Sequence, residues 1–144
     1  MSLITNEPIS ATLSLSTRLI SELGDPHSTL RATTDRCGPA VLVYAGGEVD
    51  ACNERTWRNL IREAVAVVTR PGPLVIDVSG LDFMACCAFT ALANGAKRCQ
   101  DRGVELRVVS REAIVARIVD ASGLGGLLPI YPTVDSALAS AARW

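Results

Sequence analysis

The chain has 144 residues, a length that suits one domain with a buried core. Its formal charge of −1 and its lack of a Lys/Arg-rich run argue against nucleic-acid binding. No apolar stretch is long enough to span a membrane and no secretory signal is visible, so we expect a cytoplasmic protein without membrane contact. Its five cysteines then predict free thiols rather than a disulfide framework.

The N-terminal residues differ in composition from the rest of the chain. Residues 1–27 are rich in Ser and Thr, and their apolar residues follow no clear helical period. This composition predicts a flexible N-terminal arm, because such a segment buries too little apolar surface to order itself. We expect the folded domain to occupy residues 28–144.

The domain alternates short apolar runs with longer segments of helical periodicity. Strands are expected over residues 28–34, 40–45, 74–78, 104–109 and 127–131. Helices are expected between residues 50 and 71, and over about 86–103, 110–123 and 132–144. The order β-β-α-β-α-β-α-β-α predicts an α/β fold with a mostly parallel sheet of about five strands and about four helices. The first two strands, joined by a turn, would add an antiparallel edge.

The stretch 73–92 carries the strongest functional signal in the chain. Residues 74–78 are typical of a strand covered on both faces, and helical spacing begins at Ala88. Residues 82–87 would therefore form a loop at the carboxyl end of a strand and the amino end of a helix. Ligands of open α/β sheets collect beyond the carboxyl ends of strands, and helix amino termini present unpaired N–H groups.

Cys86 and Cys87 lie at this predicted junction. Backbone N–H groups at a helix start would lower the pKa of a thiol there and make the thiol reactive. Alternatively, small polarisable side chains pack well at a tight strand-to-helix junction. We favour packing for Cys87 and leave both interpretations open for Cys86. The two thiols are poor disulfide partners, because bridging adjacent residues requires strain.

Enzymatic chemistry finds little support in the sequence. There is no Cys-x-x-Cys motif, and one histidine, His27, supplies neither a zinc site nor a Ser-His-Asp triad. Cys52 and Arg58 have the spacing of a thiol phosphatase loop, but the residues between them lack Gly and fall in a predicted helix. Glu48 and Asp50 are more typical of helix capping or of solvated side chains. We therefore expect no enzyme activity, cofactor or metal, and by elimination a recognition module.

Several motifs, in their order, resemble the STAS domain of anti-sigma factor antagonists. They are Gly47-Glu-Val-Asp50, Leu74 to Met84, Val108-Val-Ser110, Ala116 to Leu124 and Tyr131-Pro-Thr133. The resemblance covers about residues 40–138, and the double cysteine is most similar to an actinobacterial subgroup. It implies binding to an anti-sigma factor, often a serine kinase of the histidine-kinase-like ATPase type, and release of a sigma factor for transcription.

The resemblance also implies which residues contact the partner. The family's contact surface maps onto Asp50 and onto a segment after the third predicted strand, namely Met84, Ala85, Cys86, Cys87, Phe89 and Thr90. The family's switch loop usually reads Asp-Ser-Ser-Gly, and the partner phosphorylates its first Ser. Here Ala85-Cys-Cys-Ala88 matches that loop, so Cys86 stands at the phosphoacceptor position.

This substitution leaves two hypotheses for regulation. A thiol is not an ordinary substrate of a serine kinase, so the chain is either always competent to bind or switched by oxidation of Cys86. Three alternative functions stay open: a STAS sensor or scaffold for a small ligand or another signalling protein, a thiol-dependent enzyme using Cys86 or Cys52, and an interaction module with inert cysteines. We expect a monomer or a weak homodimer.

Overall fold

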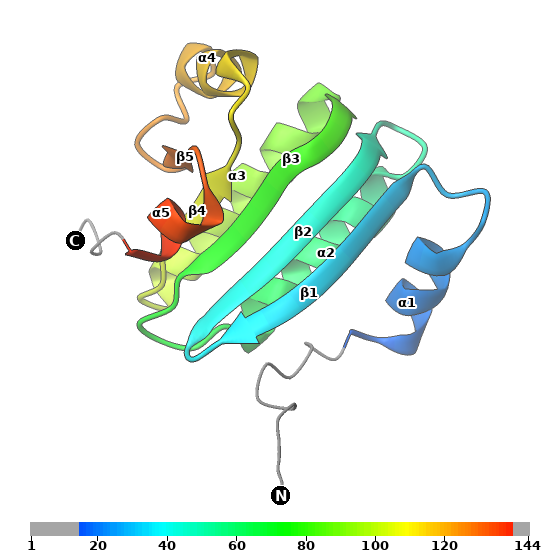
Figure 1. The fold of residues 1–144 in the computed structure, drawn as a ribbon, viewed down its shortest axis with the longest axis horizontal. Coiled ribbons are helices and arrows are strands. Elements are labelled where there is room, and N and C mark those ends of the chain that lie inside the picture. Colours follow the sequence, from blue (N-terminus) through cyan, green and yellow to red (C-terminus); the bar gives the residue numbers. More distant parts are fainter. Residues whose placement is uncertain (1–14, 140–144) are drawn as a thin grey trace, which may run out of the picture.

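A five-stranded mixed sheet, with strands in the order β1-β2-β3-β4-β5, organises the chain (Figure 1). The computed structural model describes residues 15–139. The strands are β1 Leu30–Cys37, β2 Ala40–Val49, β3 Leu74–Met84, β4 Leu106–Val109 and β5 Ile130–Tyr131. β1 pairs antiparallel with β2, and the other three pairs are parallel. The predicted α/β fold, with a mostly parallel sheet and an antiparallel edge, is confirmed.

The described residues contain five helices. They are α1 Thr17–Gly24, α2 Glu54–Val67, α3 Cys86–Asp101, α4 Ala113–Ala121 and α5 Val134–Ala139. α2 and α3 lie side by side on one face of the sheet, whereas α5 lies on the other face (Figure 1). The sequence predicts that the last helix continues to residue 144. Residues 140–144 lie outside the described range. Within residues 15–139, no helix has the length and apolar character to cross a bilayer.

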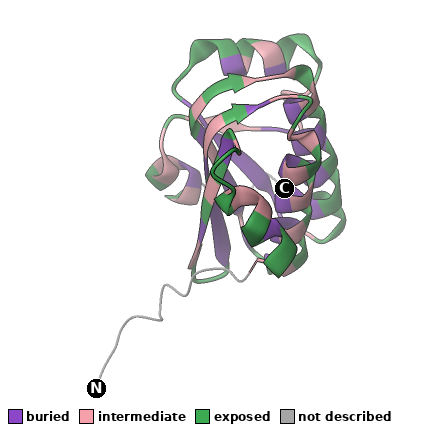
Figure 2. Cartoon of the chain, turned by 90° about the vertical axis from the view of Figure 1, so that its right-hand side faces the viewer, coloured by how far each residue is buried: buried purple, intermediate pink, exposed green. Residues whose placement is uncertain are grey.

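The main core fills the space between the sheet and helices α2 and α3, where Figure 2 shows most of the buried residues. Alternate strand residues such as Val43 and Ile76 point into this layer, because successive side chains of a strand face opposite sides. Trp57 of α2 is fully buried, and its indole N–H donates to the carbonyl of Ala88 at 3.1 Å. This bond joins α2 to the first turn of α3 and so helps to hold the start of α3 in place.

Helix α1 is the main difference from the expected flexible arm of residues 1–27. Thr17–Gly24 forms a helix whose Leu19 is 1% exposed within the main core. The Ser16 hydroxyl accepts from the Leu19 N–H at 3.2 Å and donates to Glu63 of α2 at 2.6 Å. The bond to Glu63 and the packing of Leu19 join residues far apart in the sequence, so local periodicity does not reveal them. Residues 1–14 of the predicted arm lie outside the described residues.

β2 and β3 extend further than the sequence indicates. The strand expected over residues 40–45 continues through Gly46 and Gly47, which lie inside β2 and pair with β3 across a bulge. Gly47 has φ +91°, and a Cβ there would lie 1.9 Å from the carbonyl oxygen of Thr29. Only glycine fits such a position, so the first residue of the Gly-Glu-Val-Asp motif has a structural role. Of the loop expected over residues 82–87, β3 takes up residues 82–84 and α3 takes up residues 86 and 87, which leaves Ala85 between them.

We predict that Leu19→Ala destabilises the domain, because it removes a fully buried side chain. Large-to-small substitutions of this kind cost about 2–5 kcal/mol in free energy of unfolding. Ile20→Ala is the matched control, since Ile20 is 55% exposed on the same helix and should change stability by less than about 0.5 kcal/mol. Chemical denaturation of both variants checks this, and equal stabilities would show that α1 is not docked.

Candidate functional site

The parallel pairing of β2 with β3 brings two distant segments to one edge of the sheet. Val49 is the register partner of Met84, and the N–H of Ala85 donates to the carbonyl of Val49 at 2.9 Å. Asp50 directly follows Val49, and α3 begins one residue after Ala85. Asp50 and the start of α3, which the family resemblance assigned to one contact surface, therefore lie next to each other. Figure 1 shows the ends of β2 and β3 side by side.

Asp50 organises the turn that leads into α2. One oxygen of its half-buried carboxylate accepts from the N–H groups of Cys52, at 2.9 Å, and Asn53, at 3.3 Å. Asn53 occupies the N-cap position, but its side chain bonds to the carbonyl of Glu48 and the hydroxyl of Thr29 instead of to the helix. Asp50 therefore has the turn-stabilising role expected from its position, and one of its carboxylate oxygens is used for that role.

The helix start presents Cys86 and Thr90 to solvent. α3 begins at Cys86, with Ala85 as the N-cap residue, and Ala85 has no side-chain acceptor for the helix N–H groups. Cys86 and Thr90 are both exposed. The Thr90 hydroxyl donates to the Cys86 carbonyl at 3.4 Å, one turn back along the helix. These two predicted contact residues thus share an accessible stripe of α3.

Cys87 lies in a different environment from Cys86. It is half-buried, and burial raises the pKa of its thiol. The carboxylates of Glu54 and Asp50 raise this pKa further, and they outweigh the opposing backbone N–H groups of Cys87 and Ala88. The pKa lowering expected at a helix start is therefore wrong for Cys87, and packing describes this residue better.

The remaining predicted contact residues differ in exposure. Met84 and Ala85 are half-buried, whereas Phe89 is only 5% exposed. A partner would therefore meet little of the Phe89 ring, and this residue mainly supports the surface from below. The Cys52 and Arg58 pair does not form a phosphate-binding loop, because Arg58 lies in α2 and pairs with Glu54 at 3.2 Å.

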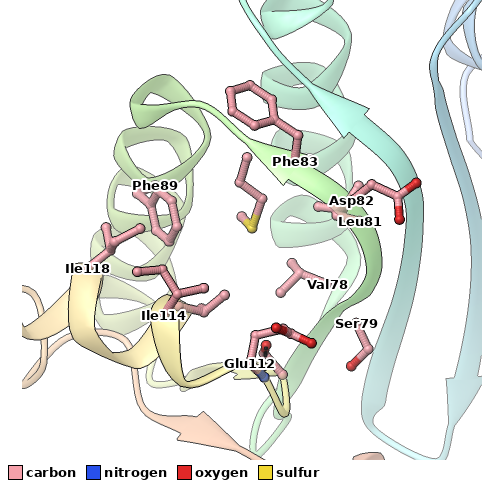
Figure 3. Close-up of a pocket in the computed structure, with 12 residues that line it drawn as sticks. Val78, Ser79, Leu81, Asp82, Phe83, Phe89, Glu112, Ile114 and Ile118 are labelled. Atoms are coloured by element: carbon pink, nitrogen blue, oxygen red, sulfur yellow. Dashed lines mark hydrogen bonds between the residues drawn. The ribbon is translucent and has the colours of Figure 1, made fainter.

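A groove of about 480 Å³ adjoins this edge between the end of β3 and α4 (Figure 3). It is lined by Met84 and Phe89 together with residues that were not among the expected contact residues. Those residues are Val78, Ser79, Leu81, Asp82, Phe83, Ser110, Glu112, Ile114, Val115 and Ile118. Ser110 directly follows β4, which pairs in parallel with β3, and this position after a parallel strand is the sequence signal that could have placed it near the site.

The fold and this edge define an α/β domain whose candidate site residues lie at a strand-to-helix junction. The family model described as STAS domain matches residues 31–137, so the chain belongs to the STAS domain family. This confirms the resemblance inferred from the motifs.

Curated relatives and solved structures agree with this assignment. A Mycobacterium tuberculosis protein provisionally named as an anti-anti-sigma factor is 64% identical, over 96% of this chain and 93% of that protein. The anti-sigma-F factor antagonist RsfA of Mycobacterium tuberculosis is 50% identical, over 78% of this chain and 88% of RsfA. An anti-sigma factor antagonist from Mycobacterium paratuberculosis has a similar structure, with a TM-score of 0.67, 28% identity, and coverage of 81% of this chain and 96% of that chain.

We predict that Cys87 alkylation by iodoacetamide is slow at neutral pH and accelerates as the pH rises, because the thiolate is the reacting species. Glu54→Gln removes a carboxylate that raises the Cys87 pKa, so it should speed alkylation at pH 7.5 by roughly two- to fivefold. Asp101→Asn, at the other end of α3, is the control and should leave the rate unchanged. Peptide mass spectrometry measures the rates, and a slower rate in Glu54→Gln would contradict the electrostatic explanation.

Proposed function

We propose that this chain is an anti-sigma factor antagonist that binds an anti-sigma factor in the cytoplasm and thereby frees a sigma factor for transcription. The observation that carries the proposal is the co-location of Asp50 with the accessible start of α3 at one sheet edge. The names of the two Mycobacterium tuberculosis relatives support the same function. The surface offers recognition chemistry, namely half-buried apolar side chains beside exposed polar ones.

The proposed partner is an anti-sigma factor of the serine-kinase-like ATPase type, in keeping with the family resemblance. Cys86 is exposed at the position that matches the phosphoacceptor, so a partner docked on α3 would cover it. A charge introduced there would be desolvated on binding, and it would oppose the complex in the way that phosphorylation opposes it in the family.

We predict micromolar or tighter binding when this chain is titrated into a panel of kinase-type anti-sigma factors that includes the Mycobacterium tuberculosis anti-sigma-F factor. Cys86→Asp should weaken binding at least about tenfold, which corresponds to about 1.4 kcal/mol. Cys37→Asp is the matched control, because Cys37 is an exposed cysteine at the far end of β1. Isothermal titration calorimetry gives both affinities.

Failure of the folded protein to bind any member of the panel would overturn the proposed function. It would favour the alternative of a STAS module that recognises a small ligand. Equal binding by wild type and Cys86→Asp would agree with the proposed function, but it would show that the contact surface does not include the start of α3.

We further propose that oxidation of Cys86 regulates binding. Hydrogen peroxide would convert the thiol to a sulfenic acid and be reduced to water, which adds a polar oxygen at the contact surface. We predict that peroxide weakens binding by the wild type but not by Cys86→Ala, as measured by calorimetry before and after treatment. Unchanged wild-type affinity would instead describe an antagonist that is always competent to bind.

Kinase treatment tests the premise of this regulation. Incubation with the anti-sigma factor and ATP, followed by mass spectrometry, should find no phosphate on the residues around Cys86. Thr90 and Ser79 are the nearest hydroxyl-bearing residues along the chain. Phosphate on either of them would show that phosphorylation can regulate this chain, and it would contradict regulation by the Cys86 thiol alone.

A further inference from the structure

The groove between β3 and α4 has an apolar part and a polar part. In Figure 3 the side chains of Phe89, Ile114 and Ile118 lie together, with Val78 facing them across the groove. Glu112 lies at the lower end of the same view. A ligand that fills this groove therefore needs apolar groups along most of its length and a polar group at one end.

Two large apolar side chains border the groove and remain open to solvent. Phe83 is 52% exposed and Ile114 is 51% exposed. Among the described residues, only Ile20 and Tyr44 are also large, apolar or aromatic, and comparably exposed. Exposed apolar side chains that gather at one place mark a surface that a partner covers. A protein segment that lies along the groove would cover both of these side chains.

The polar part of the groove is acidic. Asp82 and Glu112 are exposed, and neither carboxylate has an ion pair or hydrogen bond within residues 15–139. The described lining contains no Lys, Arg or His. Arg111 precedes Glu112 in the chain, but its Nε donates to the carbonyl of Pro132 at 3.4 Å, toward β5. The charge that complements this part of the groove is therefore positive.

The groove is continuous with the proposed contact surface. Met84 and Phe89 belong to both, and Met84 immediately precedes the N-cap residue of α3. A partner seated on the start of α3 would therefore reach the groove without any movement of this domain. This continuity favours a segment of that same partner over an unrelated ligand.

We propose that the groove receives a basic amphipathic segment of the anti-sigma factor. Apolar side chains of that segment fill the space beside Phe83 and Ile114, and one Lys or Arg side chain lies beside Glu112. The Asp82 carboxylate, which points away from Glu112 in Figure 3, adds to the negative charge of this surface. This inference rests on the proposed function, and it extends the contact surface from the α3 start to the β4–α4 connection and α4.

Substitutions at the border test the apolar contact. Phe83→Lys and Ile114→Lys, each in the full chain, should weaken binding to the Mycobacterium tuberculosis anti-sigma-F factor at least about tenfold, because each places a positive charge among apolar side chains of a basic segment. Ile20→Lys on α1 is the matched control, with 55% exposure in the wild type and an expected change below about twofold. Circular dichroism confirms that the variants fold. Unchanged affinity in both groove variants would overturn the inference.

Charge substitutions test the electrostatic contact. The double variant Asp82→Asn with Glu112→Gln should weaken binding and should also flatten its dependence on salt, because the complementary charges have been removed. Asp101→Asn is the control, since this exposed carboxylate lies at the far end of α3. Tighter binding by the double variant, or an unaltered salt dependence, would show that the partner segment is not basic.

A photo-crosslink identifies the occupant directly. With p-benzoylphenylalanine in place of Ile114, the complex should yield an anti-sigma factor peptide that carries Lys or Arg among apolar residues. A crosslinked acidic peptide, or a peptide of this chain from a second copy, would overturn the inference. A small molecule retained in the groove, seen by native mass spectrometry, would overturn it as well.

The outcomes separate the inference from the proposed function. A wild-type chain that fails to bind the whole panel of anti-sigma factors overturns both. A wild-type chain that binds, loses affinity with Cys86→Asp and tolerates every groove substitution overturns the inference alone.

Discussion

The parallel pairing of β2 with β3 is the constraint on which the functional edge depends. The register runs from Val41 and Leu74 to Val49 and Met84, and the Ala85 N–H extends it by one further bond. Two parallel strands end at the same edge, so the turn after β2 must lie beside the start of α3. A Cβ at Gly80 would approach the Ala45 carbonyl to 2.8 Å, so the close contact of these strands depends on glycine.

The chemistry at this edge suits recognition. Asp50 holds the turn before α2, and burial with nearby carboxylates raises the pKa of the Cys87 thiol. Cys86 remains exposed, at the position where the family resemblance places its phosphoacceptor. The adjoining groove adds apolar and acidic groups next to the same helix start. One edge of this STAS domain thus combines the proposed contact surface with an exposed thiol.

The face of the sheet that α5 covers contains a buried ion pair. Arg107 and Glu105 are 2% and 3% exposed, and their side chains meet at 2.8 Å. Arg107 also donates to the carbonyl of Ala137 in α5, and its guanidinium lies 5.6 Å from the centre of the Tyr131 ring. Removing either partner of such a pair leaves an unpaired buried charge. Because Arg107 also bonds to α5, the loss would weaken the packing of α5 against β4.

The sequence by itself determined the order of the elements from β1 to α5, the antiparallel edge, the parallel strands and the STAS family, because apolar periodicity and short motifs are local properties. It also located the junction at Cys86. Only the tertiary structure decided the docking of α1, the burial of Phe89, the length of β2 through Gly47, and the groove. Each of these features depends on contacts between residues far apart in the chain. Hydrogen bonds between strands decide where a strand ends, and packing against other elements decides which side chains are buried.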